Sequence, residues 1–188
     1  MSEVRAVQKT EMPEINAQAA IVVTQHEGRI LLEKNARMKL PPAFLTKITA
    51  SIIALEKCNP TDKVTVSENV VKQVSGWKSA AAVNLEAGEQ ISVLDLVYSM
   101  MLVSANDSLF ALAEFICGGI DKFAVMMEEK AKEIGAESTV ITSADGKFTS
   151  EQYSNAYDLA IICRYCMTNR IFRNIAASDK YTIPATNL

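Results

Sequence analysis

The sequence has few of the residues that bind transition metals. It contains one histidine, His26, and four cysteines, of which Cys163 and Cys166 alone form a Cys-x-x-Cys pair. A closed zinc site needs four ligands with local pairing, and no second pair lies near this one. The pair also falls inside a predicted helix, where buried or half-buried thiols are the common finding. The sequence therefore predicts no metal and no cofactor.

Long hydrophobic runs and an excess of charge are also lacking. The longest apolar stretches, 17–24 and 97–103, are much shorter than a membrane span. Residues 1–16 are polar, so no signal peptide is expected in the chain. The net charge of −3 gives no electrostatic reason to expect nucleic acid as a partner.

The chain does have enough apolar residues for a folded core. Hydrophobic residues make up 49% of the 188 positions and charged residues 22%, a composition typical of a globular domain. The length suits one domain, or a large piece of a bigger one. The sequence shows no internal repeat, low-complexity tract or linker.

Hydrophobic periodicity predicts a β-hairpin followed by a helix-rich middle. The β-branched runs 19–25 and 29–35 flank a turn at His26-Glu27-Gly28 and predict the hairpin. Five longer segments have helical periodicity with start or stop signals: 43–57, 93–103, 108–117, 121–134 and 153–167. Shorter elements are expected at 63–66 (strand), 67–74 (helix or turn), 172–177 (helix) and 181–183 (strand), with a loop at 75–90. Ser92 with Asp95 resembles a capping box, and Ser154 or Asn155 caps the last long helix.

The segment Leu40-Pro-Pro-Ala-Phe-Leu-Thr-Lys47 is the most informative part of the sequence. A Pro-Pro break before an apolar helical run predicts a helix N-terminus near residue 43. Residues three apart share a helix face, so Phe44 and Lys47 are expected side by side. A hydroxyl at position 44 would complete Ser-x-x-Lys, the nucleophile-and-base pair of the penicillin-recognising enzymes. This chain has a phenyl ring there.

A second polar element, Ser104-Ala105-Asn106, lies between two predicted apolar helices. It places a hydroxyl and a carboxamide together in a loop. Taken alone, the triplet is common, and it equally fits helix capping. Taken alone, Lys47 fits an ordinary surface lysine in the first turns of a helix, and Phe44 fits a core residue.

Together, these motifs resemble the serine-type D-alanyl-D-alanine carboxypeptidases, the low-molecular-weight penicillin-binding proteins. The resemblance runs from about Pro13 almost to the end of the chain. Its stretches are 13–20 (PEINAQAA), 28–34 (GRILLEK), 40–50 (LPPAFLTKITA), 91–107 (ISVLDLVYSMMLVSAND) and 153–160 (YSNAYDLA). It implies an α/β, β-lactamase/transpeptidase-like three-layer sandwich. Residues 17–188 would form part of that domain, after an N-terminal extension of residues 1–16.

The resemblance also implies roles for four positions. Phe44 stands where the family has its nucleophilic serine, and Lys47 stands at the general base. Ser104 corresponds to the proton relay and Asn106 to a residue of the substrate and relay site. The family's third motif, Lys-Thr-Gly, lies on a strand near the end of its domain, and these 188 residues contain no Lys-Thr-Gly. We therefore expect a truncated fold, with the hairpin and the helices but without the C-terminal strands.

Neighbouring hydroxyls are not expected to replace the serine. Thr46 is two residues on, roughly 200° around the helix, and points away from the face of Lys47. Ser51 falls one turn below Lys47, in the predicted core. If Phe44 packs against Lys47, desolvation should lower the pKa of the lysine.

Two classes of function remain open. The first is a carboxypeptidase-family protein of peptidoglycan metabolism that is inactive because it lacks the serine. The second is a non-catalytic protein that binds peptidoglycan peptides or a partner chain. The resemblance implies stem peptides ending in D-Ala-D-Ala or β-lactams as ligands, and the cell envelope as the compartment. An incomplete sheet would leave an open edge that favours self-association.

Overall fold

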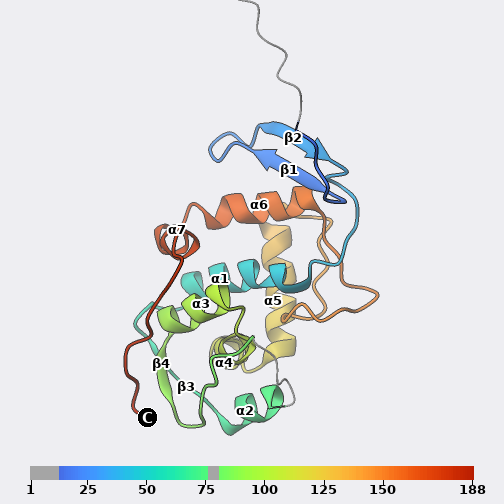
Figure 1. Ribbon diagram of the computed structural model, residues 1–188. Coiled ribbons are helices and arrows are strands. Elements are labelled where there is room, and N and C mark those ends of the chain that lie inside the picture. Colours follow the sequence, from blue (N-terminus) through green and yellow to red (C-terminus); the bar gives the residue numbers. More distant parts are fainter. Residues whose placement is uncertain (1–12, 76–80) are drawn as a thin grey trace, which may run out of the picture.

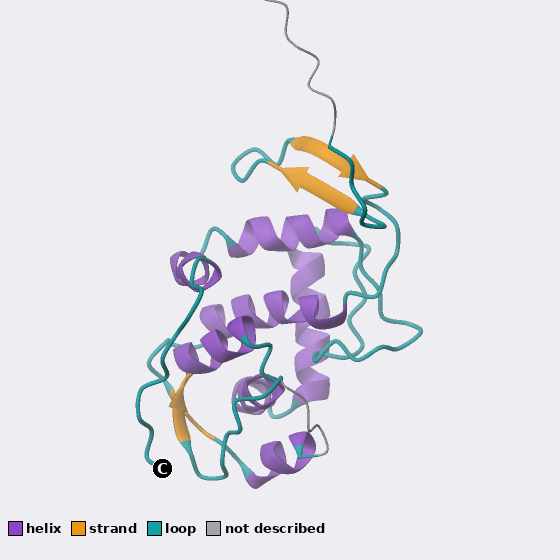
Figure 2. Ribbon diagram, in the orientation of Figure 1, coloured by secondary structure: helices purple, strands orange, loops and turns teal. Residues whose placement is uncertain are grey.

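The computed structural model describes residues 13–75 and 81–188. Most of the predicted extension (1–16) and part of the predicted loop (75–90) lie outside the described residues. Figures 1 and 2 show a two-stranded hairpin lying against one side of a body of helices. The mixed α/β composition predicted from the sequence is confirmed.

The hairpin consists of β1 (Ala20–Val23) and β2 (Ile30–Lys34), which pair antiparallel as predicted. It is held to the helix α6 (Ala156–Cys166) by Arg164, whose guanidinium donates to the carbonyls of Gln25 (3.2 Å) and His26 (3.2 Å). In the part of the chain that the structure describes, no third strand pairs with this hairpin. Within that part, the expectation of an incomplete sheet holds.

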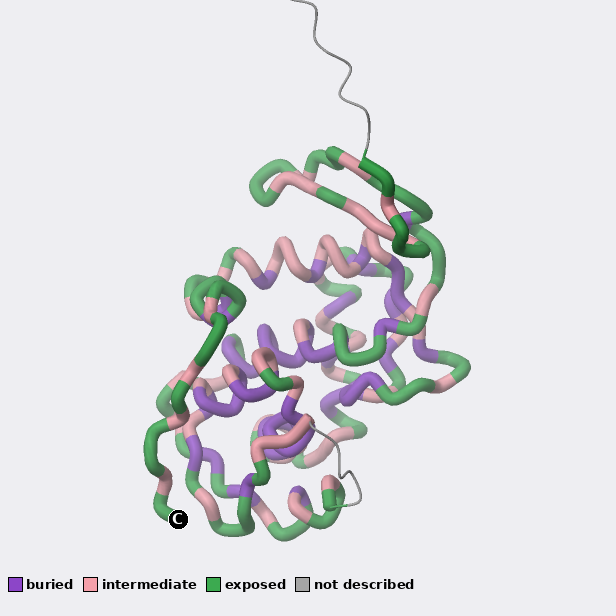
Figure 3. Tube along the Cα trace, in the orientation of Figure 1, coloured by how far each residue is buried: buried purple, intermediate pink, exposed green. Residues whose placement is uncertain are grey.

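The core lies among helices packed around α1 (Thr46–Lys57), which crosses the middle of the molecule (Figure 1). Its partners are α3 (Val93–Leu102), α4 (Asn106–Cys117), α5 (Ile120–Glu133), α6 and α7 (Arg170–Ala176). Figure 3 shows the buried segments concentrated on α1, α3 and α4. Large side chains fully buried in the core include Ile52 on α1, Leu96 on α3, Leu109 on α4 and Phe123 on α5. Burial of apolar side chains on α1 from all sides makes this helix a rigid support for the residues at its start.

A second small sheet joins β3 (Lys63–Thr65) to β4 (Gln90–Ser92). The sequence placed β4 partly in a loop, because three residues carry too short an alternation to indicate a strand. The predicted capping box is confirmed, since Asp95 N–H donates to Ser92 Oγ at 3.1 Å and opens α3. The helix α2 (Glu68–Val74) is capped in the same way by Ser67.

Several predicted elements differ from the structure in their bounds, and one predicted strand does not form. The helix expected at 43–57 opens with a 3₁₀ turn, Ala43–Leu45, before α1 proper. The helix expected from 108 begins at Asn106. No strand covers 181–183, because Tyr181 is held by its side chain: its ring stacks on Tyr98 (3.7 Å between centroids) and its hydroxyl donates to Asp95 at 2.7 Å.

The thiols do not form a metal site in the described residues. No group of three or more potential metal ligands occurs among them. Cys166 is buried, and burial raises the pKa of its thiol to about 12, so the metal-binding thiolate is disfavoured. None of the described helices is long and apolar enough to cross a membrane.

Candidate functional site

The start of α1 is set by a close contact with the loop that precedes α6. Gly146 lies so near the backbone of Ala43 that a Cβ atom added to it would be 2.1 Å from the Ala43 carbonyl oxygen. Thr46 adds a second tie, since its hydroxyl donates to the carbonyl of Ala144 at 2.8 Å. Ala43 itself has a φ of +46°, a left-handed conformation that costs a non-glycine residue about 1–2 kcal/mol. The tertiary contacts therefore fix the backbone from which the next side chain projects.

That side chain, Phe44, stands at the surface beside Lys47. It is 54% exposed, so its interpretation as a core residue is wrong. The centroid of its ring lies 4.9 Å from Lys47 Nζ, within the range of a cation–π interaction. The prediction that residues 44 and 47 share a face is confirmed.

The Lys47 amine is buried and fully hydrogen-bonded. Lys47 is only 2% exposed, so it is not an ordinary surface lysine. Its Nζ donates to the carboxamide oxygen of Asn106 (2.7 Å), to the hydroxyl of Ser104 (3.0 Å) and to the carbonyl of Ser104. Three acceptors match the three N–H bonds of an ammonium group. The residues singled out in the sequence thus meet at one nitrogen atom.

The Ser104-Ala105-Asn106 segment forms the tight junction between α3 and α4. Ala105 is the N-cap of α4 and no side chain caps it, so the capping explanation of Ser104 and Asn106 is wrong. Ser104 has a φ of +59°, a conformation uncommon outside glycine. Asp107 anchors the start of α4 by accepting hydrogen bonds from the backbone N–H groups of Val83 and Leu85. The junction is therefore held in a strained shape that directs two polar groups to Lys47.

Burial lowers the pKa of the Lys47 amine. Desolvation lowers its pKa from 10.5 to about 8, against the opposing effect of the Asp145 and Asp107 carboxylates. The expected lowering of the pKa is supported, and its cause is the burial of Lys47 as a whole. The lowered pKa increases the unprotonated fraction of this amine at a given pH.

We expect NMR of the labelled lysine side chains to show one amine, absent in Lys47→Met, that titrates near pH 8. Because the folded chain releases this proton earlier than the unfolded chain, the group's contribution to the free energy of unfolding should rise between about pH 8 and 10.5. The stability difference between the parent and Lys47→Met should change over the same interval. A midpoint near 10.5 would contradict the burial argument.

The other nearby hydroxyls are committed to backbone groups. Thr46 Oγ1 donates to the carbonyls of Ala144 and Ala43. Ser51 is buried, as predicted, and its hydroxyl donates to the carbonyl of Lys47 at 2.7 Å. Ser104 is thus the residue whose hydroxyl contacts the Lys47 amine.

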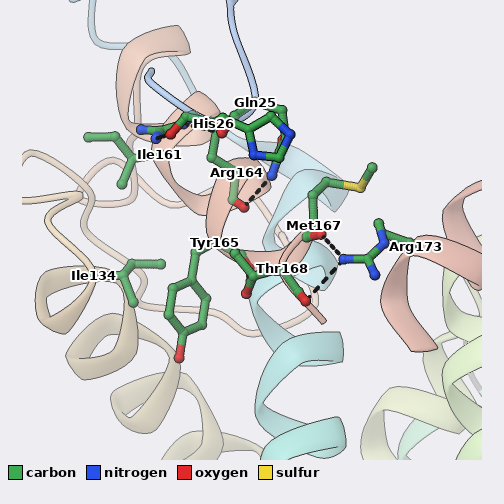
Figure 4. A pocket seen from close by; sticks show the side chains of 9 residues that line it. All are labelled: Gln25, His26, Ile134, Ile161, Arg164, Tyr165, Met167, Thr168 and Arg173. Carbon is green, nitrogen blue, oxygen red and sulfur yellow. Dashed lines mark hydrogen bonds between the residues drawn. The ribbon is translucent and has the colours of Figure 1, made fainter. Parts of the chain in front are cut away.

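A large open cavity lies away from this cluster. It has a volume of about 770 Å³ and is formed by the hairpin turn, α6, the end of α5 and α7. Figure 4 shows Arg164 and Arg173 in its wall, and Arg173 donates to the carbonyls of Met167 and Thr168. Neither Lys47 nor any of its partners lines this cavity. It therefore contributes no chemical group to the predicted site.

The family of the chain follows from comparison with known proteins. A match to the D-alanyl-D-alanine carboxypeptidase family covers residues 6–186. The chain belongs to this family. D-alanyl-D-alanine carboxypeptidase DacF of Bacillus subtilis is 32% identical over 153 residues, which cover 79% of this chain and 38% of that protein. DacC of Escherichia coli is 31% identical over 164 residues, which cover 84% of this chain and 41% of that protein. The chain thus spans about two fifths of the length of these curated carboxypeptidases.

Solved structures of the family share the fold of this chain. Penicillin binding protein 6B of Escherichia coli superposes with a TM-score of 0.85 at 28% identity, covering 94% of this chain and 58% of that one. The D-alanyl-D-alanine carboxypeptidase of Mycobacterium tuberculosis gives 0.85 at 26% identity, covering 97% and 68%. The predicted α/β, β-lactamase/transpeptidase-like fold is confirmed.

Sequence reasoning missed two residues that support the site. The pair Asp145-Gly146 is typical of a turn, and the structure adds that Gly146 packs against the backbone of Ala43. Asp107 was not singled out, although it holds the segment after residue 80 against α4. The Asp-Gly pair was a visible signal for a turn, but nothing in the sequence shows which backbone the turn contacts.

Proposed function

We propose that this chain is a D-alanyl-D-alanine carboxypeptidase-like protein of peptidoglycan metabolism that does not turn over a D-alanyl-D-alanine peptide. In this proposal Lys47 holds the place of the general base, Ser104 that of the proton relay, and Asn106 that of a substrate and relay residue. The observation that carries it is the joint geometry: the Lys47 amine is bonded to Ser104 and Asn106, and a phenyl ring lies beside it. Membership of the family supports a place in the cell envelope.

Two features support the absence of turnover. A phenyl ring has no lone pair that can attack a carbonyl carbon, and loss of a covalent nucleophile removes several orders of magnitude in rate. The 188 residues also contain no Lys-Thr-Gly, the motif that, by resemblance, supplies the other side of the oxyanion site. The proposed ligands are stem peptides ending in D-Ala-D-Ala, or β-lactams.

A fluorescent penicillin tests this proposal directly. We expect no covalent label on the chain after denaturation, because residue 44 offers no hydroxyl to acylate. A penicillin-binding relative labelled in parallel serves as the positive control. A stable label on this chain would contradict the proposed inactivity.

A non-catalytic binding role is the second candidate, and the retained polar cluster favours it. Lys47, Ser104 and Asn106 stay buried or half-buried and hydrogen-bonded although the nucleophile is absent. In the same assay, reversible binding of the penicillin or of a D-Ala-D-Ala peptide without labelling would favour this role. If the chain shows neither covalent labelling nor reversible binding, the proposed binding role is wrong.

A further inference from the structure

The direction of one hydrogen bond of Lys47 depends on whether its amine is protonated. As an ammonium group, Nζ donates to all three of its partners. As a free amine it keeps two N–H bonds and gains one lone pair. Two of the partners, the Ser104 carbonyl and the Asn106 carboxamide oxygen, can only accept. The hydroxyl of Ser104 is the one partner that holds a proton to donate.

Loss of the Lys47 proton therefore reverses one hydrogen bond. The two N–H bonds remain on the carbonyl and carboxamide oxygens, and the lone pair faces the Ser104 hydroxyl 3.0 Å away. This is hydrogen-bond distance for a base that takes the proton of an attacking hydroxyl. The amine needs no movement to reach this arrangement.

The backbone at Ser104 is suited to presenting a hydroxyl. Its φ of +59° places it in a strained, left-handed turn between two helices. The residue is only partly buried, whereas Lys47 behind it is buried. A strained turn that holds a serine hydroxyl beside a base is also how unrelated hydrolases hold their nucleophile.

We propose that Ser104 and Lys47 act as a serine–lysine pair that accepts the acyl group of a small activated ester. The Ser104 oxygen forms a bond to the carbonyl carbon, and its proton passes to Lys47 Nζ. The bond from that carbon to the leaving oxygen then breaks, and a phenolate departs with the electron pair. The products are an ester on Ser104 and a phenolate, and the proton on Nζ is released to solvent. This activity is independent of the proposed peptide binding.

The surroundings of Lys47 limit the substrate to small esters with good leaving groups. The Phe44 ring lies 4.9 Å from Nζ, so a small acyl group fits beside the amine better than a large one. An amide also needs a proton delivered to its leaving nitrogen, whereas a nitrophenolate leaves without one. The charged groups that act on Lys47 are Asp107, on α4, and Asp145, in the loop before α6. They raise the pKa of Lys47, against the larger effect of desolvation.

The test uses p-nitrophenyl acetate with the 188-residue chain. We expect a burst of one equivalent of nitrophenolate and an acetyl group on Ser104 that hydroxylamine removes. The burst rate should rise with pH with a midpoint near 8, as Lys47 loses its proton. Ser104→Gly should abolish the burst while keeping the fold, because glycine accepts the positive φ. Lys47→Met should slow acylation on the order of 100-fold and remove the pH midpoint.

Ser178→Ala is the matched control, since its hydroxyl is exposed and donates to the carbonyl of Asn174, outside the site. Its burst should equal that of the parent chain. A hydroxylamine-resistant acetyl group on Lys47, or a parent chain with no adduct on Ser104, would overturn the proposal whatever the variants do. A penicillin label would instead contradict the proposed inactivity, so the two failures are distinguishable.

Discussion

Restoring serine at position 44 is not expected to restore carboxypeptidase activity in this chain. In the 188 residues, Phe44→Ser should hydrolyse a D-alanyl-D-alanine peptide within about tenfold of Phe44→Ala, which lacks both ring and hydroxyl. The reason is that, by resemblance, the oxyanion needs donors from a Lys-Thr-Gly strand, and that motif is absent from the sequence. Release of D-alanine measures the rate.

A chain extended with a Lys-Thr-Gly segment should respond differently to the same substitutions. When a relative's segment containing Lys-Thr-Gly is joined after Leu188, Phe44→Ser should exceed Phe44→Ala by on the order of 10³-fold or more. The comparison with alanine separates the hydroxyl from the mere removal of the ring. If the 188-residue Phe44→Ser variant already shows that increase, the Lys-Thr-Gly strand is not required. If the joined chain shows none, position 44 is not the nucleophile's place.

Substitution of Gly146 by alanine should be among the most destabilising single changes in the chain. A Cβ there would lie 2.1 Å from a backbone carbonyl oxygen of Ala43, which cannot turn aside as a side chain can. The positive φ of +79° adds about 1–2 kcal/mol of backbone strain, and overpacking adds about 1–3 kcal/mol. We expect a loss of roughly 2–5 kcal/mol in urea denaturation, a large part of the stability of an ordinary domain.

Gly88→Ala is the matched control for that experiment. Gly88 has a similar φ of +86°, but nothing lies within 4 Å of an added Cβ. It should lose only the backbone part, about 1–2 kcal/mol. The difference between the two variants isolates the contact with the start of α1. Equal losses in both would show that Gly146 does not position Phe44 and Lys47.

Much of the local structure could be predicted because its causes lie close together in the chain. Alternation and a Gly-containing turn predicted the hairpin, and the Ser92–Asp95 pattern predicted the start of α3. Asn155 caps α6 through a bond to the Asp158 N–H at 2.7 Å, as one of two expected candidates. Short strands and helix boundaries were less predictable, because distant side-chain contacts such as that of Tyr181 decide them.

The candidate site likewise has features that follow from local sequence and features that depend on tertiary contacts. The sequence by itself determined that Phe44 and Lys47 share a helix face, since a spacing of three residues is a local property of a helix. It also placed Ser104 and Asn106 at a junction of two helices. Only the tertiary structure decided that these groups meet at one buried nitrogen, across separations of 57 and 59 residues.

The tertiary structure also decided the chemical state of that nitrogen. Packing of α1 against α3 and α4 removes Lys47 from water and lowers its pKa, an effect that depends on surroundings and not on the residue type. The contact of Gly146 with Ala43 likewise arises where distant segments meet. Sequence patterns report local preferences, whereas burial, strain and long-range hydrogen bonds exist only after the chain has packed.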